Sequence, residues 1–268
     1  MTLDKLALHT WTLDTTPLAD VLRIAGLTGW SAIELRRIDF NRAVEAGHRP
    51  EDVLDVVRAS GLPVAAVGVE SGWMFAAGDE RQRLLRVFAD SCRWAAALGC
   101  ATVMSPVDRG RGPADQAAAG IREVGDIAAK HDVRLALEFN SQAEQLNTLA
   151  RIREVVAQAG HAHCGLLLDT YHLQRSGADL RAIEAVAPEE VAYFQYSDVP
   201  RSGLEPGKAL DRLPPGQGCV PFREIFGLLA RKGYEGYLSY EAPNPAAWAR
   251  DPAAVAREAL EATRALLP

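Results

Sequence analysis

Eight short apolar runs, each followed by an amphipathic stretch, constrain the fold of this chain more than any other feature of its sequence. The runs are nearly continuous in hydrophobicity, which is typical of parallel strands that are covered by helices. They span residues 6–12, 31–37, 62–70, 100–106, 133–139, 164–169, 191–198 and 236–241. Most of the amphipathic stretches end in a turn that contains glycine, as helices commonly do.

The number of these strand–helix units indicates a closed barrel. A (β/α)8 TIM barrel takes about 250 residues, and the chain has 268. We therefore predict the α/β class, with a single TIM-barrel domain over residues 1–268. A doubly wound open sheet is the alternative on pattern alone. Neither GxGxxG after the first strand nor GxxxxGK[ST] occurs, so a nucleotide-binding fold lacks its motif.

The composition and charge of the chain limit which binding partners and which cellular location we expect. The chain is 48% hydrophobic and 24% charged, as ordinary globular proteins are. Its formal net charge of −6 leaves no broad basic surface for nucleic acid, and Arg109 and Arg111 form the only notable basic cluster in a loop. The N-terminus has no signal-peptide pattern, and no segment reaches the ~18 apolar residues of a membrane span. We predict a cytoplasmic protein that binds neither nucleic acid nor membrane.

Polar side chains occupy the ends of four successive predicted strands. They are Glu138, Asp169, Gln195 and Glu241. In a parallel barrel these strand ends meet at the face that carries the active site, where three carboxylates would raise one another's pKa unless a cation lay between them. The alternative is that they are surface carboxylates paired with arginines. We predict a hard divalent metal ion bound by these four oxygen ligands.

Other residues are candidates for substrate contact or proton transfer. His172 follows Asp169 by three residues and could contact substrate oxygens or move a proton. Arg201 could clamp a carboxylate, phosphate or hydroxyl group, or be a solvated loop charge. The remaining predicted substrate contacts are His9, Trp11, Trp73 and Asn140, which end or follow the first, third and fifth strands.

Motifs of other catalytic classes are absent from the sequence. There is no GxSxG nucleophile elbow and no HExxH pair. The four cysteines are far apart and form no metal-binding pair, so we expect reduced thiols and no cysteine nucleophile.

The segments LALEFN, LLLDTYH, FQYSDVPR, LPPGQGCVPFREIF and YLSYEAP resemble the xylose isomerase-like TIM-barrel superfamily of sugar (phosphate) isomerases and epimerases. The resemblance covers nearly the whole chain and is strongest over residues 134–244. In the ketose 3-epimerases of that superfamily the metal ligands are Glu, Asp, His and Glu, and both glutamates act as acid or base. The resemblance carries these roles to Glu138, Asp169, Gln195 and Glu241, and substrate contact to His172 and Arg201.

Gln195 departs from the epimerase pattern, because it stands where those enzymes have histidine. An amide oxygen in place of an imidazole nitrogen favours Mg²⁺ or Mn²⁺, with Co²⁺ as a further candidate. The 3-dehydroshikimate dehydratases of the superfamily also have glutamine there and a PGQG turn, and inosose dehydratases are further relatives. Endonuclease IV, a DNA-repair relative, uses a histidine-rich metal cluster, whereas this chain has six histidines and an acidic charge.

The resemblance implies an enzyme that acts on a small polyhydroxy carbonyl compound. We predict a divalent-metal-dependent isomerase or epimerase of a small sugar or ketopolyol, acting through a metal-stabilised enediolate. The alternative is a metal-dependent dehydratase, a lyase, of a cyclic hydroxy-ketone such as 3-dehydroshikimate or an inosose. A non-enzyme alternative is a silent sugar-binding barrel. The substrate, its phosphorylation, the native metal and homo-oligomer formation are left open.

Overall fold

A computed structural model describes residues 3–203 and 209–268. Its eight parallel strands form a closed barrel in chain order, β1 to β8, with helices between them. This confirms the predicted (β/α)8 TIM barrel and excludes the open sheet. Across the described ranges, no helix combines the length and the apolar character that a membrane span needs.

The contacts of the chain define two compact units. The first contains the described residues of Met1–Ala65 and Phe194–Pro268, and the second is Ala66–Tyr193. The boundaries fall within β3 (Val64–Gly68) and at β7 (Val191–Tyr196). The single domain over residues 1–268 stays a prediction, and the two units are described separately below.

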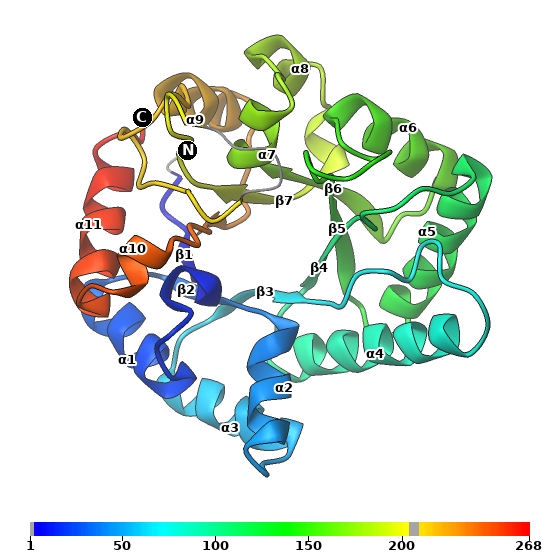
Figure 1. The fold of residues 1–268 in the computed structure, drawn as a ribbon, viewed down its shortest axis with the longest axis horizontal. Coiled ribbons are helices and arrows are strands. Elements are labelled where there is room, and N and C mark those ends of the chain that lie inside the picture. The colour runs from blue at the N-terminus through cyan, green and yellow to red at the C-terminus, as the bar shows by residue number, and fades with distance from the viewer. Residues whose placement is uncertain (1–2, 204–208) are drawn as a thin grey trace. The chain divides into compact units, whose positions relative to one another are not determined.

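In the first unit, neighbouring strands place His9 beside Glu34 and Gln195 beside Ser239. Helix α1 packs against α3 and α11, which flank it in Figure 1. Aromatic rings fill the interior, and Trp30 stacks on Tyr240 at 5.9 Å between ring centroids. Besides its part of β3 and β7, this unit has β1 (Leu6–His9), η1 (Thr10–Leu13), α1 (Leu18–Thr28), β2 (Ala32–Leu35), α2 (Arg37–Glu45), α3 (Pro50–Ser60), α9 (Phe222–Arg231), β8 (Leu238–Tyr240), α10 (Pro245–Trp248) and α11 (Pro252–Arg264).

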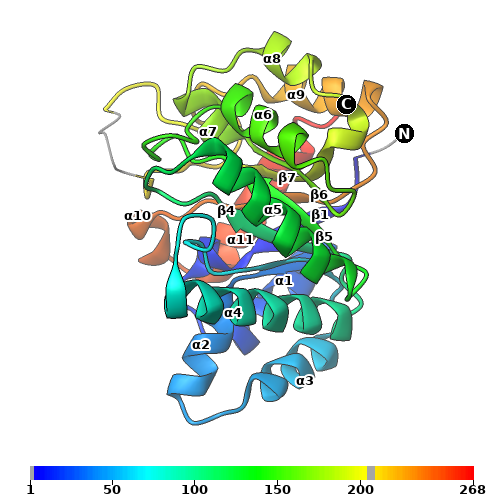
Figure 2. The ribbon, with the colours of Figure 1, turned by 90° about the vertical axis from the view of Figure 1, so that its right-hand side faces the viewer.

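In the second unit, β5 pairs with β4 and with β6, so that Glu138 lies opposite Pro106 on one side and Leu167 on the other. Helix α5 packs against α4 and α6, and Figure 2 shows these helices side by side. This unit has β4 (Thr102–Pro106), β5 (Arg134–Glu138), β6 (Cys164–Asp169), α4 (Gly78–Ala97), α5 (Ala114–Ala129), α6 (Leu149–Ala159), α7 (Thr170–Arg175), α8 (Leu180–Glu184) and η2 (Pro188–Glu190).

Several predicted strands end earlier than their apolar patterns do, and in two of them a helical turn begins directly after the strand. The run over 6–12 is a strand only to His9, because the His9 side chain accepts a hydrogen bond from the Trp11 backbone N–H and starts the 3₁₀ turn η1. The run over 31–37 stops at Leu35, and α2 follows, a helix that the sequence pattern did not indicate. The Asp39 carboxylate accepts from the Arg36 backbone N–H at 2.7 Å and so stabilises the start of α2.

Candidate active site

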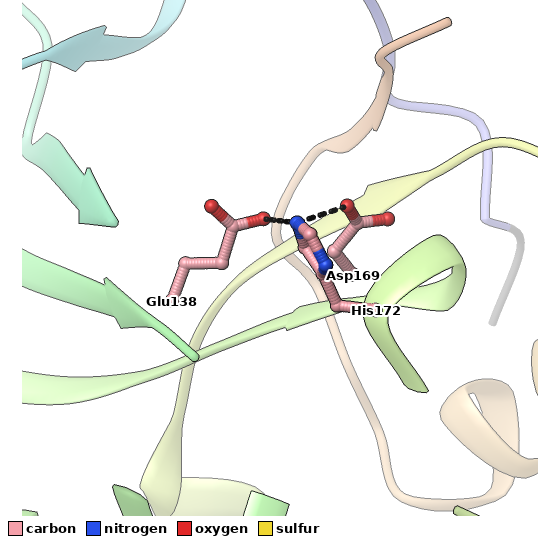
Figure 3. Close-up of side chains that lie close together, drawn as sticks. All are labelled: Glu138, Asp169 and His172. Atoms are coloured by element: carbon pink, nitrogen blue, oxygen red, sulfur yellow. Dashed lines mark ion pairs between the residues drawn. The ribbon is translucent and has the colours of Figure 1, made fainter. Parts of the chain in front are cut away.

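Three predicted site residues come together at the ends of β5 and β6 in the second unit. Glu138 and Asp169 are the last residues of these strands, and His172 lies in α7 directly after β6. One ligand atom from each lies within 4.8 Å of the others, and all three side chains are buried. Figure 3 shows the side chains pointing toward one another. This Glu–Asp–His cluster could hold a divalent metal ion.

The sequence DTYH brings Asp169 and His172 together through local structure. Asp169 is the N-cap of α7, and its Oδ1 accepts a hydrogen bond from the Tyr171 backbone N–H at 3.0 Å. Side chains three residues apart lie on the same face of a helical turn. His172 Nε2 is therefore 3.9 Å from Asp169 Oδ2, and it is 3.7 Å from Glu138 Oε1.

Ser141 determines which ring nitrogen of His172 carries the proton in the neutral form. The Ser141 backbone N–H donates to His172 Nδ1 at 3.3 Å, and the Ser141 hydroxyl lies 2.9 Å from the same atom. Nδ1 therefore has a lone pair, and the neutral ring has its proton on Nε2. Nε2 is the ring nitrogen nearest to Glu138 and Asp169, so in this tautomer His172 is a hydrogen-bond donor, and it could ligate a metal through Nε2 only after losing that proton. Sequence reasoning missed Ser141, which no motif marks.

Gln195 lies in the first unit and is paired with a carboxylate. Its Nε2 donates to Glu34 Oε1 at 2.8 Å, and both side chains are fully buried. Within the described part of the chain, the buried Oε1 atom of Gln195 has no hydrogen-bond partner. Buried polar atoms are rarely left without a partner, and such an atom calls for an explanation such as an ion or water.

Glu241 is held by an arginine that the sequence analysis did not select. Arg212 Nη1 donates to Glu241 Oε2 at 2.8 Å and to the Glu241 backbone oxygen at 3.2 Å. Both side chains are buried. Glu241 Oε1 lies 3.4 Å from His9 Nε2, so the carboxylate lies between an arginine and a histidine. Arg212 directly precedes the LPPGQG turn. That turn was the only feature of the sequence that could have drawn attention to Arg212.

The turn that carries Arg212 is organised by Asp198. The buried Asp198 carboxylate accepts hydrogen bonds from the backbone N–H groups of Val199, Gly216, Gly218 and Val220 at 2.7–2.9 Å. The backbone of Asp198 also pairs with Leu213, the residue after Arg212. A Cβ atom on Gly218 would lie 2.1 Å from the Val199 carbonyl oxygen, so the turn needs glycine there.

His9 is buried between two acidic side chains of the first unit, Glu34 and Glu241. Its Nδ1 accepts from the Trp11 backbone N–H at 3.1 Å, so the neutral ring has its proton on Nε2. Nε2 lies 3.6 Å from Glu34 Oε1 and 3.4 Å from Glu241 Oε1. Burial lowers the pKa of His9 well below its usual value, and the charges of Arg36 and Arg212 lower it further. His9 is therefore a neutral N–H donor near pH 7.

The remaining predicted substrate contacts differ in exposure. Trp73 is fully buried, and its indole N–H donates to the Ser105 hydroxyl at 3.0 Å, so its ring belongs to the core. Trp11 is partly exposed, with the Arg36 guanidinium 5.9 Å from its ring centre. Asn140 is also partly exposed, and Arg201 is exposed in the loop after β7. Substrate binding by these residues stays a prediction.

The described cysteines are free thiols, as expected. Burial raises the pKa of Cys92 and of Cys164 to about 12, so both are protonated at neutral pH. Neither thiol is therefore suited to act as a nucleophile.

A family model described as xylose isomerase-like TIM barrel matches residues 20–266. The chain belongs to this family, as the resemblance in the sequence implied.

Two curated relatives are enzymes. An inosose isomerase of Halalkalibacterium halodurans is 27% identical over 126 residues, which are 47% of this chain and 45% of the relative. A 3-dehydroshikimate dehydratase of Pseudomonas aeruginosa is 28% identical over 129 residues, 46% of this chain and 20% of the relative. The matches thus span less than half the length of each relative.

A solved structure with the same fold is that of the IolI protein with a bound zinc atom. It superposes with a TM-score of 0.84 at 19% identity, covering 98% of this chain and 96% of IolI. At this identity the likeness shows the fold alone.

Proposed function

We propose that the protein is a divalent-metal-dependent enzyme that removes a proton next to the carbonyl group of a small polyhydroxy substrate. The observation that carries the proposal is the buried cluster of Glu138, Asp169 and His172 at the strand ends. Two buried carboxylates in one cluster are costly unless a positive charge compensates them. The enzymatic activities of the curated relatives support a sugar-modifying reaction.

The proposed metal ligands are the four residues selected from the sequence, Glu138, Asp169, Gln195 and Glu241. The donor set fits a hard divalent ion, because it consists of three carboxylates and an amide oxygen. The buried Oε1 of Gln195, which has no hydrogen-bond partner among the described residues, fits a role as a ligand. Mg²⁺ and Mn²⁺ are the first choices, with Co²⁺ next, and zinc is added to the panel because IolI binds it.

A divalent ion bound there would supply positive charge that stabilises the negative charge developing on a substrate oxygen. The residues of the chain supply the proton transfers. Glu138 and Glu241 are proposed as the base and the acid. The Nε2–H of His172 is proposed to donate a hydrogen bond to a substrate oxygen, because Ser141 holds the ring in the required tautomer. Arg212 keeps one oxygen of Glu241 in a defined direction.

Isomerisation or epimerisation is the first proposed reaction. After the base has taken the proton, the second glutamate returns one to the substrate. Nuclear magnetic resonance in D₂O tests this, with a panel of inososes and small ketoses. Enzyme-dependent incorporation of deuterium next to the carbonyl is expected. A panel without any such exchange would count against the reaction, whereas any exchange would exclude a silent sugar-binding barrel.

Dehydration is the second candidate. It is favoured by the 28% identity to a 3-dehydroshikimate dehydratase and by the resemblance of the sequence to such dehydratases, which implies a glutamine at the position of Gln195. The same first step would then be followed by loss of hydroxide, with His172 as a helper. Incubation with Mn²⁺ and 3-dehydroshikimate separates the two reactions, since dehydration produces the ultraviolet absorbance of protocatechuate and isomerisation does not.

The predictions about binding partners and cellular location rest on the sequence alone. Cytoplasmic location and the absence of nucleic-acid and membrane partners stay predictions, and homo-oligomer formation stays open. The proposed partner is a small polyhydroxy carbonyl compound.

A further inference from the structure

The side-chain amide of Gln195 has one satisfied end and one unsatisfied end. Its NH₂ group donates to Glu34 at 2.8 Å, while its buried oxygen has no hydrogen-bond partner among the residues that the structure describes. Leaving a buried acceptor without a partner costs about 1–3 kcal/mol. The observed orientation of the Gln195 amide is therefore not explained by a hydrogen bond to its oxygen.

Glu34 accounts for the direction of the amide. A carboxylate accepts hydrogen bonds and does not donate them, so only the NH₂ end of Gln195 can face it. If the amide turned over, its oxygen would lie against the Glu34 oxygen, and two acceptors would repel in a fully buried place. Glu34 thereby selects one of the two orientations of the amide.

His9 lies beside the Glu34 carboxylate in turn. The register of β1 and β2 pairs His9 with Glu34, and the Nε2 of His9 lies 3.6 Å from Glu34 Oε1. The same Nε2 lies 3.4 Å from Glu241 Oε1, and Arg212 binds the other Glu241 oxygen. The network thus links Gln195 to Glu241, the two proposed ligands of the first unit, through buried side chains alone.

We propose that Glu34 is a positioning residue that turns the oxygen of Gln195 toward the metal ion and so makes a neutral amide an effective ligand. The inference rests on the proposed function, because it requires a metal. It goes beyond it by assigning a role to a carboxylate that is not itself a ligand. Carboxylates that hydrogen-bond to a ligand side chain fix its orientation, and losing one typically weakens metal binding about 10- to 100-fold.

The test compares Mn²⁺ affinities, measured from the electron paramagnetic resonance signal of free Mn²⁺. In Glu34→Gln the new side chain can both donate and accept hydrogen bonds, so the Gln195 amide is no longer restricted to one orientation. Mn²⁺ binding is therefore expected to weaken about 10- to 100-fold. Glu70→Gln is the matched control, because Glu70 pairs with the partly exposed Arg83 in the second unit. It should bind Mn²⁺ like the wild type.

The exchange of the two side chains is the decisive variant. Gln195→Glu alone places two carboxylates in buried contact and is expected to lower the melting temperature measured in EDTA. The double variant Glu34→Gln/Gln195→Glu restores a donor opposite an acceptor, with an oxygen again toward the metal. It should recover at least about tenfold in Mn²⁺ affinity over Glu34→Gln. Loss of packing alone would give no such recovery.

The outcomes separate this inference from the proposed function. If the wild type binds no divalent metal, both are overturned. If the wild type binds Mn²⁺ and Glu34→Gln binds it equally well, only the role of Glu34 is overturned. If Glu34→Gln does not fold, the double variant is compared with Gln195→Glu, and failure to improve both melting temperature and Mn²⁺ affinity overturns the inference.

Discussion

The buried ion pair of Arg212 and Glu241 makes a quantitative prediction about stability. The pair is almost completely shielded from water, with 2% and 7% of the side-chain surfaces exposed. Arg212→Met removes the guanidinium and leaves a buried carboxylate without its cation, which costs about 3–5 kcal/mol when such a pair is broken from one side. For a chain of this size, that corresponds to a fall in melting temperature of about 6–20 °C.

Urea unfolding and thermal unfolding in EDTA measure this cost without bound metal. Arg201→Met is the control, because it makes the same chemical change at an exposed position and should alter stability by less than about 0.5 kcal/mol. The double variant Arg212→Met/Glu241→Leu replaces both charges by apolar groups. It should be at least about 2 kcal/mol more stable than the sum of the single effects predicts.

Two results would refute this reasoning. One is an Arg212→Met protein as stable as Arg201→Met, which would mean that the arginine does not compensate the buried charge. The other is strict additivity in the double variant, which would mean that Arg212 and Glu241 stabilise the fold independently.

The other predictions concern separate parts of the molecule. His172→Leu removes the N–H that faces the carboxylates, so deuterium exchange into substrate should slow about 10²- to 10⁴-fold while Mn²⁺ affinity stays near that of the wild type; a matching loss of Mn²⁺ affinity would make His172 a ligand. Asp198→Asn weakens charge-assisted bonds to the turn after β7 and should cost about 3 kcal/mol in urea unfolding, and an unchanged midpoint would contradict the anchoring role. In the folded protein the pKa values of Cys92 and Cys164 are raised from 9.0 to about 12. The unfolded chain therefore releases these two protons at a lower pH than the folded protein does. The stabilisation that the protonated thiols contribute is complete below pH 9.0 and is lost as the pH rises toward 12. Unfolding free energies at pH 8 and pH 10.5 should therefore differ less in Cys92→Ala/Cys164→Ala than in the wild type.

The barrel and part of the site could be predicted because both depend on local patterns. Apolar runs alternating with amphipathic stretches are a property of each segment, and eight of them leave few alternatives to a barrel. The proximity of Asp169 and His172 follows from one turn of helix after a strand. Glu138 ends the neighbouring strand, so its place beside them follows from pairing in chain order.

The partners of the other two predicted ligands could not be predicted because they depend on contacts between distant segments. Glu34 and Gln195 are 161 positions apart in the sequence, and strand register brings them together. Arg212 was overlooked because a loop arginine has no signal of burial. It reaches Glu241 through a turn that Asp198 holds by backbone hydrogen bonds. Helix α2 was missed because its start depends on a cap between Asp39 and the Arg36 backbone rather than on an apolar stripe.

Metal binding by the purified protein tests the central claim most directly. After dialysis against EDTA, Mn²⁺ is titrated into the wild type and into Asp169→Asn, and free Mn²⁺ is followed by electron paramagnetic resonance. The predicted result is saturable, stoichiometric binding by the wild type and a large loss in Asp169→Asn, whose carboxylate belongs to the buried cluster. A wild type that binds no Mn²⁺, Mg²⁺, Co²⁺ or Zn²⁺, or an Asp169→Asn protein that binds as the wild type does, would contradict it.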